Sequence, residues 1–206
     1  MLEEAQALGF LGPGPVEAHV DHAAGFAAVV EAAWADEEET AQAPSRAGDL
    51  GSGAGLPGLP LALHLPTTRW ALIESGVRRA ALLRRAVTEL GLESRVEVVE
   101  ARAEVVGRHP GLRGQLDLVV ARGFGPPGAV AECAAPLLRV GGRAVVSEPP
   151  GGDPDRWPEE GLSLVGMARG RSMAAGGSTY QVLGQVAPCP ARYPRRVGVP
   201  AKRPLF

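Results

Sequence analysis

The chain contains very little cysteine and a single lysine. Cys133 and Cys189 are the two cysteines among its 206 residues. They are too few and too isolated for a disulfide framework or a zinc site, so we expect two free thiols and no bound metal. Lys202 is the one lysine, and arginine supplies the other basic charges. We attribute that bias to coding and derive no mechanism from it.

Long apolar runs are absent as well. No stretch approaches the length of a membrane-spanning helix, and Glu3 and Glu4 stand where a signal peptide would carry basic residues. We therefore expect a soluble, cytoplasmic protein without a membrane partner. The length fits one domain with an extension and can bury a sizeable core.

Basic charge is missing from the first part of the chain. Nine acidic residues and no lysine or arginine precede Arg46, and 21 basic against 14 acidic residues make up the remainder. A basic excess of this kind is compatible with an anionic partner, although ordinary soluble domains can also carry a net positive charge of this size.

The N-terminal part has helical periodicity. We predict a short helix over 2–8 and, after Gly-Pro-Gly-Pro at 12–15, a longer helix over 15–34. Residues three and four apart give this helix one apolar face, formed by Val16, Val20, Ala24, Ala27, Val30 and Trp34. An acidic stretch beginning at Asp36 reads as a solvated linker.

From Arg46 onward, short apolar runs alternate with helical patterns, as in βαβ units. The predicted strands cover 47–50, 70–74, 96–100, 116–121 and 143–147, and the predicted helices cover 59–65, 77–90, 103–108 and 129–138. Two more strands are predicted over 162–167 and 180–186, the second one antiparallel at the sheet edge.

The sequence thus predicts three parts. Residues 1–45 form an N-terminal helical extension and acidic linker. Residues 46–187 form an α/β domain with a mostly parallel sheet and helices on both faces. Residues 188–206 form a basic tail rich in proline and arginine.

Alternating glycines follow the first predicted strand. Asp49 leads the run, and Gly51, Gly53 and Gly55 come after it. Glycine lets a backbone turn sharply off a strand and approach a ligand closely, and the next helix presents free N–H groups there. A glycine-rich surface loop would look similar. Glu74, at the end of the second strand, strengthens the case because a carboxylate suits the two hydroxyls of a ribose. Its alternative role is to cap the following helix.

The glycine run Asp-Leu-Gly-Ser-Gly-Ala-Gly-Leu-Pro-Gly (49–58), Leu-Ile-Glu-Ser (72–75), Arg-Ala-Glu (102–104) and Ala-Arg (121–122) occur in this order. Tyr-Pro-Arg-Arg-Val-Gly-Val-Pro-Ala-Lys-Arg-Pro-Leu follows at 193–205. The first run resembles the cofactor loop of class I S-adenosylmethionine-dependent methyltransferases. Together the motifs resemble the RsmG (glucose-inhibited division protein B) family, which methylates N7 of a guanine in small-subunit ribosomal RNA.

The resemblance implies a Rossmann-like class I methyltransferase fold and S-adenosylmethionine as cofactor. Carried over by position, the cofactor contacts are those of the glycine loop and the strand ends: Asp49, Gly51, Gly53, Gly55, Leu56, Glu74, Ala103, Glu104 and Arg122. Arg122 is also the candidate catalytic residue, either steadying the guanine near O6 or holding the methionine carboxylate. Guanine N7 has a free lone pair, so the chemistry requires positioning and no general base.

The implied partner is ribosomal RNA or the small ribosomal subunit, met by a protein that we expect to be a monomer. The predicted RNA contacts are His19, Arg195, Arg196, Lys202 and Arg203. His19 matches a helical histidine of the family, and prolines should keep the tail extended and the charges of the other four residues unpaired. By itself His19 reads as a helix-surface imidazole. The arginines at 78, 79, 84 and 85 read as a solvated helix face, and Phe124 reads as a core aromatic rather than a base-stacking one.

The chain departs from the family pattern in three places. It lacks an Asn-Leu-Thr segment near the N-terminus, has Ser-Glu-Pro-Pro (147–150) instead of Lys-Gly, and has Ser178-Thr179 instead of Arg-His. Each change removes a candidate RNA-facing group, so cofactor binding should be retained better than the activity on rRNA. The alternatives are a methyltransferase with another substrate and an inactive cofactor- or ribosome-binding module.

Overall fold

The computed structural model describes residues 1–35, 43–151 and 153–206. Of the predicted linker over 36–45, residues 36–42 lie outside the described residues. No helix within the described ranges is both long enough and apolar enough to cross a membrane.

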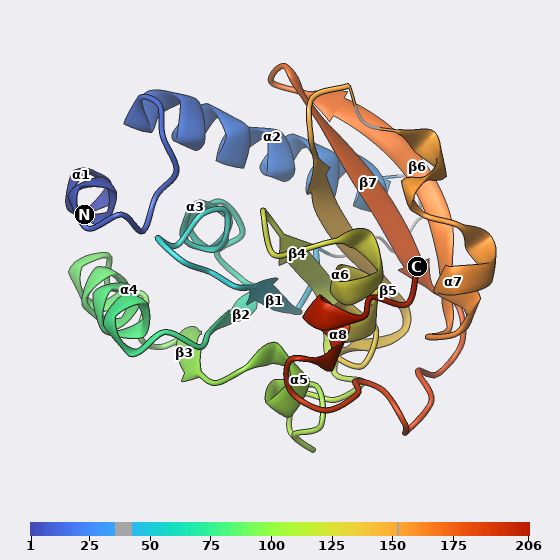
Figure 1. The fold of residues 1–206 in the computed structure, drawn as a ribbon. Helices are drawn as coiled ribbons and strands as arrows, with labels where there is room; N and C mark the ends of the chain where they lie inside the picture. Colours follow the sequence, from blue (N-terminus) through green and yellow to red (C-terminus); the bar gives the residue numbers. More distant parts are fainter. Residues whose placement is uncertain (36–42, 152) are drawn as a thin grey trace.

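A seven-stranded sheet forms the centre of the molecule, in the order β3-β2-β1-β4-β5-β7-β6 (Figure 1). The first five strands are parallel and match the predicted ones: β1 (Arg46–Leu50), β2 (Arg69–Glu74), β3 (Val96–Glu100), β4 (Leu116–Ala121) and β5 (Leu138–Glu148). β1 lies between β2 and β4, so the strand order reverses beside its carboxyl end. Ligands of open α/β sheets bind at this point.

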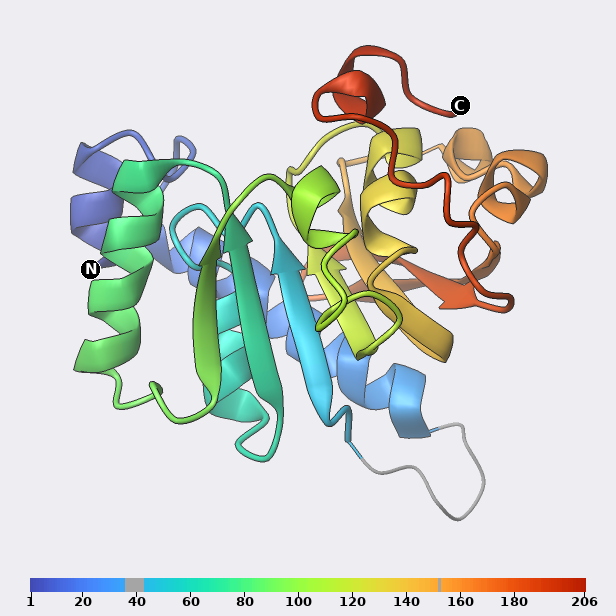
Figure 2. The ribbon, with the colours of Figure 1, turned by 90° about the horizontal axis from the view of Figure 1, so that it is seen from below.

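Helices cover both faces of the sheet, as predicted (Figure 2). On one face lie α2 (Val16–Ala35), α3 (Gly58–His64) and α4 (Val77–Glu89), whose apolar side chains share a core with β1 and β2. On the other face lie α5 (Ala103–Val106), α6 (Pro127–Ala134) and α7 (Glu159–Ser163), packed around a second core. α1 (Leu2–Ala7) precedes α2 at the N-terminus.

The apolar face predicted for the long N-terminal helix is wrong in part: Val30 is buried and Ala27 and Trp34 pack against the core, but Val20 and Ala24 are exposed. The buried side chains of α2 include Phe26, Val29, Val30 and Ala33, whereas Val20 is 41% exposed. Phe26 packs edge-on against Tyr180 with ring centroids 4.7 Å apart, and the Tyr180 hydroxyl donates to the His22 carbonyl at 2.7 Å. Contact with β7 (Ser178–Gln185) therefore decides which side of α2 faces inward.

The C-terminal third differs from the prediction in one strand. Of the strand predicted over 162–167, only Met167 lies in a strand, because Leu162 and Ser163 end α7 and β6 runs over Met167–Ala175. β7 is antiparallel to β5, as predicted, but β6 lies outside it at the sheet edge. Between β5 and α7 lies the short 3-10 helix η1 (Pro154–Arg156).

Residues 188–206 pack back onto the domain. Tyr193 is buried in the core around α6, where Leu205 and Phe206 also pack. The guanidinium of Arg113 donates to the carbonyls of Tyr193, Cys189 and Pro190 at 2.8–3.2 Å. The short helix α8 (Val199–Lys202) then lies against α6.

Candidate functional site

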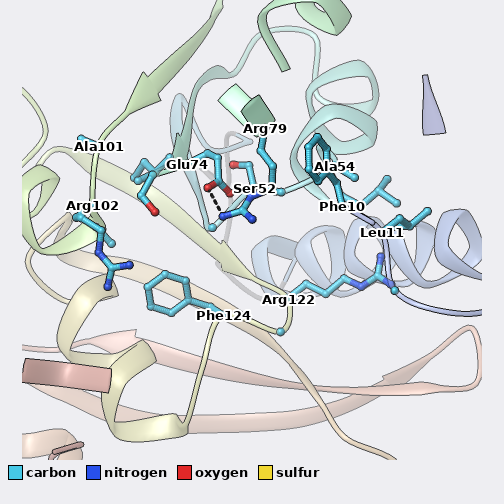
Figure 3. Close-up of a pocket in the computed structure, with 18 of the residues that line it drawn as sticks. Phe10, Leu11, Ser52, Ala54, Glu74, Arg79, Ala101, Arg102, Arg122 and Phe124 are labelled. Atoms are coloured by element: carbon cyan, nitrogen blue, oxygen red, sulfur yellow. Dashed lines mark hydrogen bonds and ion pairs between the residues drawn. The ribbon is translucent and has the colours of Figure 1, made fainter. Parts of the chain in front are cut away.

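A cavity of about 530 Å³ opens at the carboxyl ends of β1, β2 and β4 (Figure 3). Seven of the predicted cofactor residues line it: Gly51, Gly53, Leu56, Glu74, Ala103, Glu104 and Arg122. The structure thus brings together residues from four separate motifs at the point where strand order reverses.

The glycine loop forms one wall of the cavity. Gly51 and Gly53 have φ of +66° and +55°, a conformation that L side chains rarely adopt. The N–H groups of Gly51 and Ser52 donate to the Ile73 carbonyl at 2.9 and 3.0 Å, which fixes the loop against β2. A Cβ atom on Gly51 would lie 2.9 Å from the Phe124 ring. Phe124 is partly buried against the core and also lines the cavity.

Glu74 points toward the glycine loop. Its Oε2 accepts from the Gly53 N–H at 3.1 Å, and its Oε1 accepts from the Gly76 N–H at 2.6 Å and from Arg79 at 2.8 Å. Burial alone would raise the pKa of Glu74, but the bonds to Arg79 and Gly76 hold it below its ordinary value. The carboxylate is therefore charged, tethers the loop and also caps the start of α4.

Arg79 is a site residue that the sequence interpretation missed. It was expected on a solvated face, yet its guanidinium lies in the cavity wall, paired with Glu74. The side chain remains 41% exposed. Its position in the first turn of α4, five residues after the strand-end acid, is the signal that could have identified it.

Asp49 and Gly55 do not line the cavity, which corrects their assignment as direct contacts. The Asp49 side chain is buried, and its Oδ2 accepts from the Gly58 N–H at the start of α3 at 3.1 Å. Burial raises the pKa of Asp49 to about 7, against the opposing effect of hydrogen bonds from Ser52 and Gly58. A Cβ atom on Gly55 would lie 2.4 Å from Leu59. Both residues shape the loop.

Arg122, at the end of β4, reaches the cavity beside α2. One Nη donates to Nδ1 of His19, and the other Nη is buried without a hydrogen-bond partner among the described residues. Because arginine only donates, His19 must accept at Nδ1 and carry its proton on Nε2, which donates to the Gly12 carbonyl at 3.1 Å. Burial lowers the pKa of Arg122, but a guanidinium remains protonated.

His19 therefore lies at the cavity rim, where it binds Arg122. This position does not support its predicted role in RNA binding. His22, one turn further along α2, stays neutral, because burial and then the charge of Arg122 lower its pKa to about 4. The bond from His19 to Gly12 also holds the N-terminal loop, and residues 9–12 complete the cavity wall. The sequence interpretation treated that loop as a helix break and missed its place in the site.

Glu104 closes the opposite end of the cavity. Its side chain is buried, and Oε1 accepts from the Gly198 N–H at 2.8 Å and from Arg102 at 3.2 Å. Oε2 is buried without a hydrogen-bond partner among the described residues. These bonds lower the pKa of Glu104 despite its burial, which acts in the other direction. The site thus contains an unmatched acceptor at one end and an unmatched donor, on Arg122, at the other.

Comparison with known proteins identifies the family. The model of rRNA small subunit methyltransferase G (GidB) matches residues 30–148. Ribosomal RNA small subunit methyltransferase G of Roseiflexus castenholzii is 42% identical over 173 residues, which cover 79% of this chain and 72% of the relative. The same-named protein of Prochlorococcus marinus (strain MIT 9313) is 40% identical, covering 82% and 71%.

The chain belongs to the rRNA small subunit methyltransferase G family. The family inferred from the sequence motifs is therefore confirmed.

Solved structures confirm the predicted fold of this family member. A variant of MtNAS in complex with S-adenosylmethionine is similar with a TM-score of 0.60 and 16% identity, covering 90% of this chain and 71% of that one. A SAM-dependent methyltransferase from Aquifex aeolicus gives a TM-score of 0.52 and 17% identity, covering 68% and 81%. At these identities the likeness concerns the class I methyltransferase fold alone.

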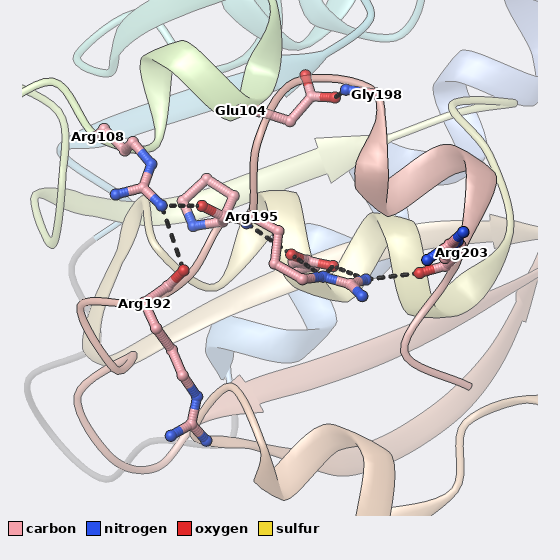
Figure 4. Close-up of polar contacts among 8 residues, drawn as sticks. Glu104, Arg108, Arg192, Arg195, Gly198 and Arg203 are labelled. Carbon is pink, nitrogen blue, oxygen red and sulfur yellow. Dashed lines mark hydrogen bonds and ion pairs between the residues drawn. The ribbon is translucent and has the colours of Figure 1, made fainter.

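The tail typical of the family is held by internal bonds, contrary to the expectation that its charges stay unpaired. Arg195 forms a two-pronged ion pair with the buried Glu132, with Nη2 2.5 Å from Oε2 and Nε 2.8 Å from Oε1 (Figure 4). This pair raises the pKa of Arg195. Arg108 also donates to the carbonyls of Arg192 and Pro194. The geometry makes Arg195 a structural residue and corrects its assignment to RNA binding.

Three other predicted RNA contacts stay on the surface. Arg196, Lys202 and Arg203 are exposed, on or beside the segment whose Gly198 N–H binds Glu104. Their role toward RNA stays a prediction.

Glu148 stands where the family pattern has Lys-Gly. Its carboxylate points into the protein and not toward solvent. Its side chain is 7% exposed and lies beside Arg156 and Trp157. The acid that stands in place of the family's Lys-Gly is therefore an internal group.

The cavity fits S-adenosylmethionine by its chemistry. The cofactor has a carboxylate that would match the unpartnered Nη of Arg122, and an adenine amine that would match the unpartnered Oε2 of Glu104. Between them, Gly51 and Gly53 remove side chains from the wall. About 530 Å³ falls within the usual range for ligands of this size.

Proposed function

We propose that the protein is an S-adenosylmethionine-dependent methyltransferase that modifies N7 of a guanine in small-subunit ribosomal RNA. Membership of the family supports the reaction and the substrate. The observation that carries the cofactor assignment is the pair of unmatched buried groups, on Arg122 and Glu104, at opposite ends of one cavity.

The cofactor would be held at three points. Arg122 would bind the methionine carboxylate, Glu104 would accept from the adenine amine, and Glu74 would accept from the ribose. Glu74 already accepts three hydrogen bonds, but a carboxylate offers about four acceptor positions. Arg79, which is partly exposed, can turn away from Glu74 to admit the sugar.

When bound, S-adenosylmethionine supplies a methyl group that is already activated by its positive sulfur. The protein therefore has to position the guanine and to exclude water, which is catalysis by proximity. The N7 lone pair forms the new bond while the carbon–sulfur bond breaks, and no proton leaves the base. Arg122, tied to His19, is better placed to fix the carboxylate than to steady O6, so its role in the reaction would be orientation.

RNA binding would involve the exposed cations of the C-terminal segment, namely Arg196, Lys202 and Arg203. Phosphate contacts by such residues supply affinity that falls with salt. A cytoplasmic location, a monomeric state and the absence of a metal remain predictions. Of the described residues, no three His, Cys, Asp or Glu side chains are grouped in a way that could hold a metal ion.

An assay with the purified protein tests the proposal. We expect it to transfer label from S-adenosylmethionine to small-subunit rRNA or to 30S particles, at a guanine that becomes cleavable by aniline after borohydride reduction, as N7-methylguanine is. Binding of the cofactor without methylation of either substrate would move the activity to another acceptor. Absence of cofactor binding would leave only a binding module of the same fold.

A further inference from the structure

A second cavity adjoins the cofactor cavity. It has a volume of about 330 Å³ and shares Gly123 and Phe124 with the first one. Its other walls come from the end of β5 and from the segment after it, including Ser147, Glu148, Arg156 and Trp157. Gly123 has φ of +61°, and a Cβ atom placed on it would meet no atom within 4 Å, so the backbone leaves space where the two cavities join.

The second cavity contains a buried carboxylate, Glu148, and a guanidinium, Arg156. The two form an ion pair, but the facing atoms make no hydrogen bond. Oε1 of Glu148 accepts from Trp157 Nε1 at 2.7 Å. Its Oε2 lies 3.3 Å from Nε of Arg156, yet both of these atoms are buried without a hydrogen-bond partner among the described residues. The Glu148 side chain is only 7% exposed. Buried polar groups are normally satisfied, and an exception calls for an explanation.

We propose that the second cavity receives the base of the acceptor nucleotide and that Glu148 selects guanine there. The inference rests on the proposed function and names the residues that read its substrate. Guanine presents two donors, N1–H and the N2 amine, which suit a carboxylate, and the acceptor O6, which suits the guanidinium of Arg156. Adenine would place its acceptor N1 against Glu148, and the two acceptors would repel.

The arrangement also leaves the reactive atom free. Guanine N7 lies on a different edge from the N1 and N2 donors, so a base held by Glu148 can turn N7 toward the cofactor cavity. Phe124, at the boundary of the two cavities, offers an apolar ring face on which an unstacked base can lie. Phe124 thereby gains the stacking role that the sequence interpretation ranked below a core role.

Removal of a single amine from the ligand tests the proposal. Inosine monophosphate is guanosine monophosphate without the N2 amine. With the protein saturated in S-adenosylhomocysteine, we expect calorimetry to show about tenfold weaker binding of the inosine nucleotide, as befits a hydrogen bond to a charged group. Glu148→Gln should weaken binding of guanosine monophosphate by more than tenfold, because both N1–H and the N2 amine lose their acceptor, and should bring the ratio of the two affinities close to one.

Three variants make this test interpretable. Glu148→Gln retains an acceptor for Trp157 Nε1, and an unchanged melting temperature would show that the fold survives. Arg156→Gln should weaken the binding of both nucleotides, because both carry O6. The ratio of the two affinities should stay unchanged. Glu159→Gln is the matched control, because Glu159 is an exposed acid of α7 that pairs with Arg169, and it should change neither affinity.

The proposal is overturned if guanosine monophosphate does not bind the wild-type complex at millimolar concentration, or if Glu148→Gln preserves the nucleotide ratio. The rRNA assay separates this failure from failure of the proposed function. Undiminished methylation by Glu148→Gln would overturn the base site alone. Absence of methylation by the wild-type protein would overturn the function itself. The proposal expects at least a tenfold loss in kcat/KM for Glu148→Gln.

Discussion

At the scale of single residues, the site depends on polar groups that other parts of the chain hold in place. Arg122 is oriented by a neutral imidazole, Glu74 by the N–H of Gly53, and Glu104 by the N–H of Gly198. Each partner is distant in the sequence. Substitution of one of these partners should therefore weaken only those ligands that carry the chemical group bound by the residue it orients.

His19→Ala tests the orientation of Arg122. Loss of the acceptor for Arg122 should weaken the binding of S-adenosylhomocysteine five- to tenfold. Methylthioadenosine lacks the carboxylate and should bind with the same affinity as it does to the wild-type protein. Calorimetry with both ligands measures this difference. His64→Ala is the control, because His64 is half-exposed and pairs with Glu31 on α2. An equal loss for both ligands would show that His19 supports the fold and not the carboxylate site.

Gly53→Val tests the glycine loop. The residue has φ of +55° and lines the cavity, so a branched side chain would both strain the backbone and fill the ligand's space. We expect binding of S-adenosylhomocysteine to be abolished. Gly91→Val is matched to it, since Gly91 has φ of +66° in open space and does not line the cavity. Micromolar binding retained in Gly53→Val would count against the site.

Asp49→Asn tests the buried acid under the loop. Because burial raises its pKa in the folded protein to about 7, above the ordinary 3.8, the folded state holds a proton that the unfolded chain releases. Its contribution to stability is fully present below about pH 4 and is lost as pH rises to about 7. Urea unfolding at several pH values should show that Asp49→Asn removes this loss. Parallel pH profiles for both proteins would contradict it.

At the scale of elements, the parallel strands could be predicted because each is a short apolar run that ends at, or is followed by, a glycine or a charged residue. The wrong predictions lie where the local structure depends on contacts between distant segments. The many alanines and valines of α2 do not define one apolar face, and Phe26 packs inward against Tyr180 of β7 and within the core shared with α3. Leu162 was read as a strand residue, but one turn of helix also buries it.

The C-terminal segment gives the prediction at this scale. Arg195→Ala leaves the buried Glu132 without its partner, which should cost about 3 kcal/mol of the free energy of unfolding. Arg196→Ala removes an exposed neighbour and should cost less than about 0.5 kcal/mol. In RNA binding, Arg196→Ala should reduce the slope of affinity against salt by about 1. Equal stabilities of the two variants would show that the ion pair with Glu132 contributes nothing.

At the scale of the whole molecule, the site joins parts that the sequence presents as separate. The family model covers residues 30–148, yet residues 9–12 form a cavity wall and Gly198 binds Glu104. Motifs predicted the loop, the strand-end acid and Arg122, because these groups follow strand ends whose positions are regular. The partners His19 and Gly198 could not be predicted in these roles, since they depend on how distant segments pack.

A methylation map of small-subunit rRNA tests the central claim most directly. The map would compare the source organism with a strain lacking this gene, and with the same strain carrying the wild-type or the Gly53→Val gene. We predict one N7-methylguanine that is lost on deletion, restored by the wild-type gene and not restored by Gly53→Val. An unchanged set of N7-methylguanines after deletion would contradict this prediction.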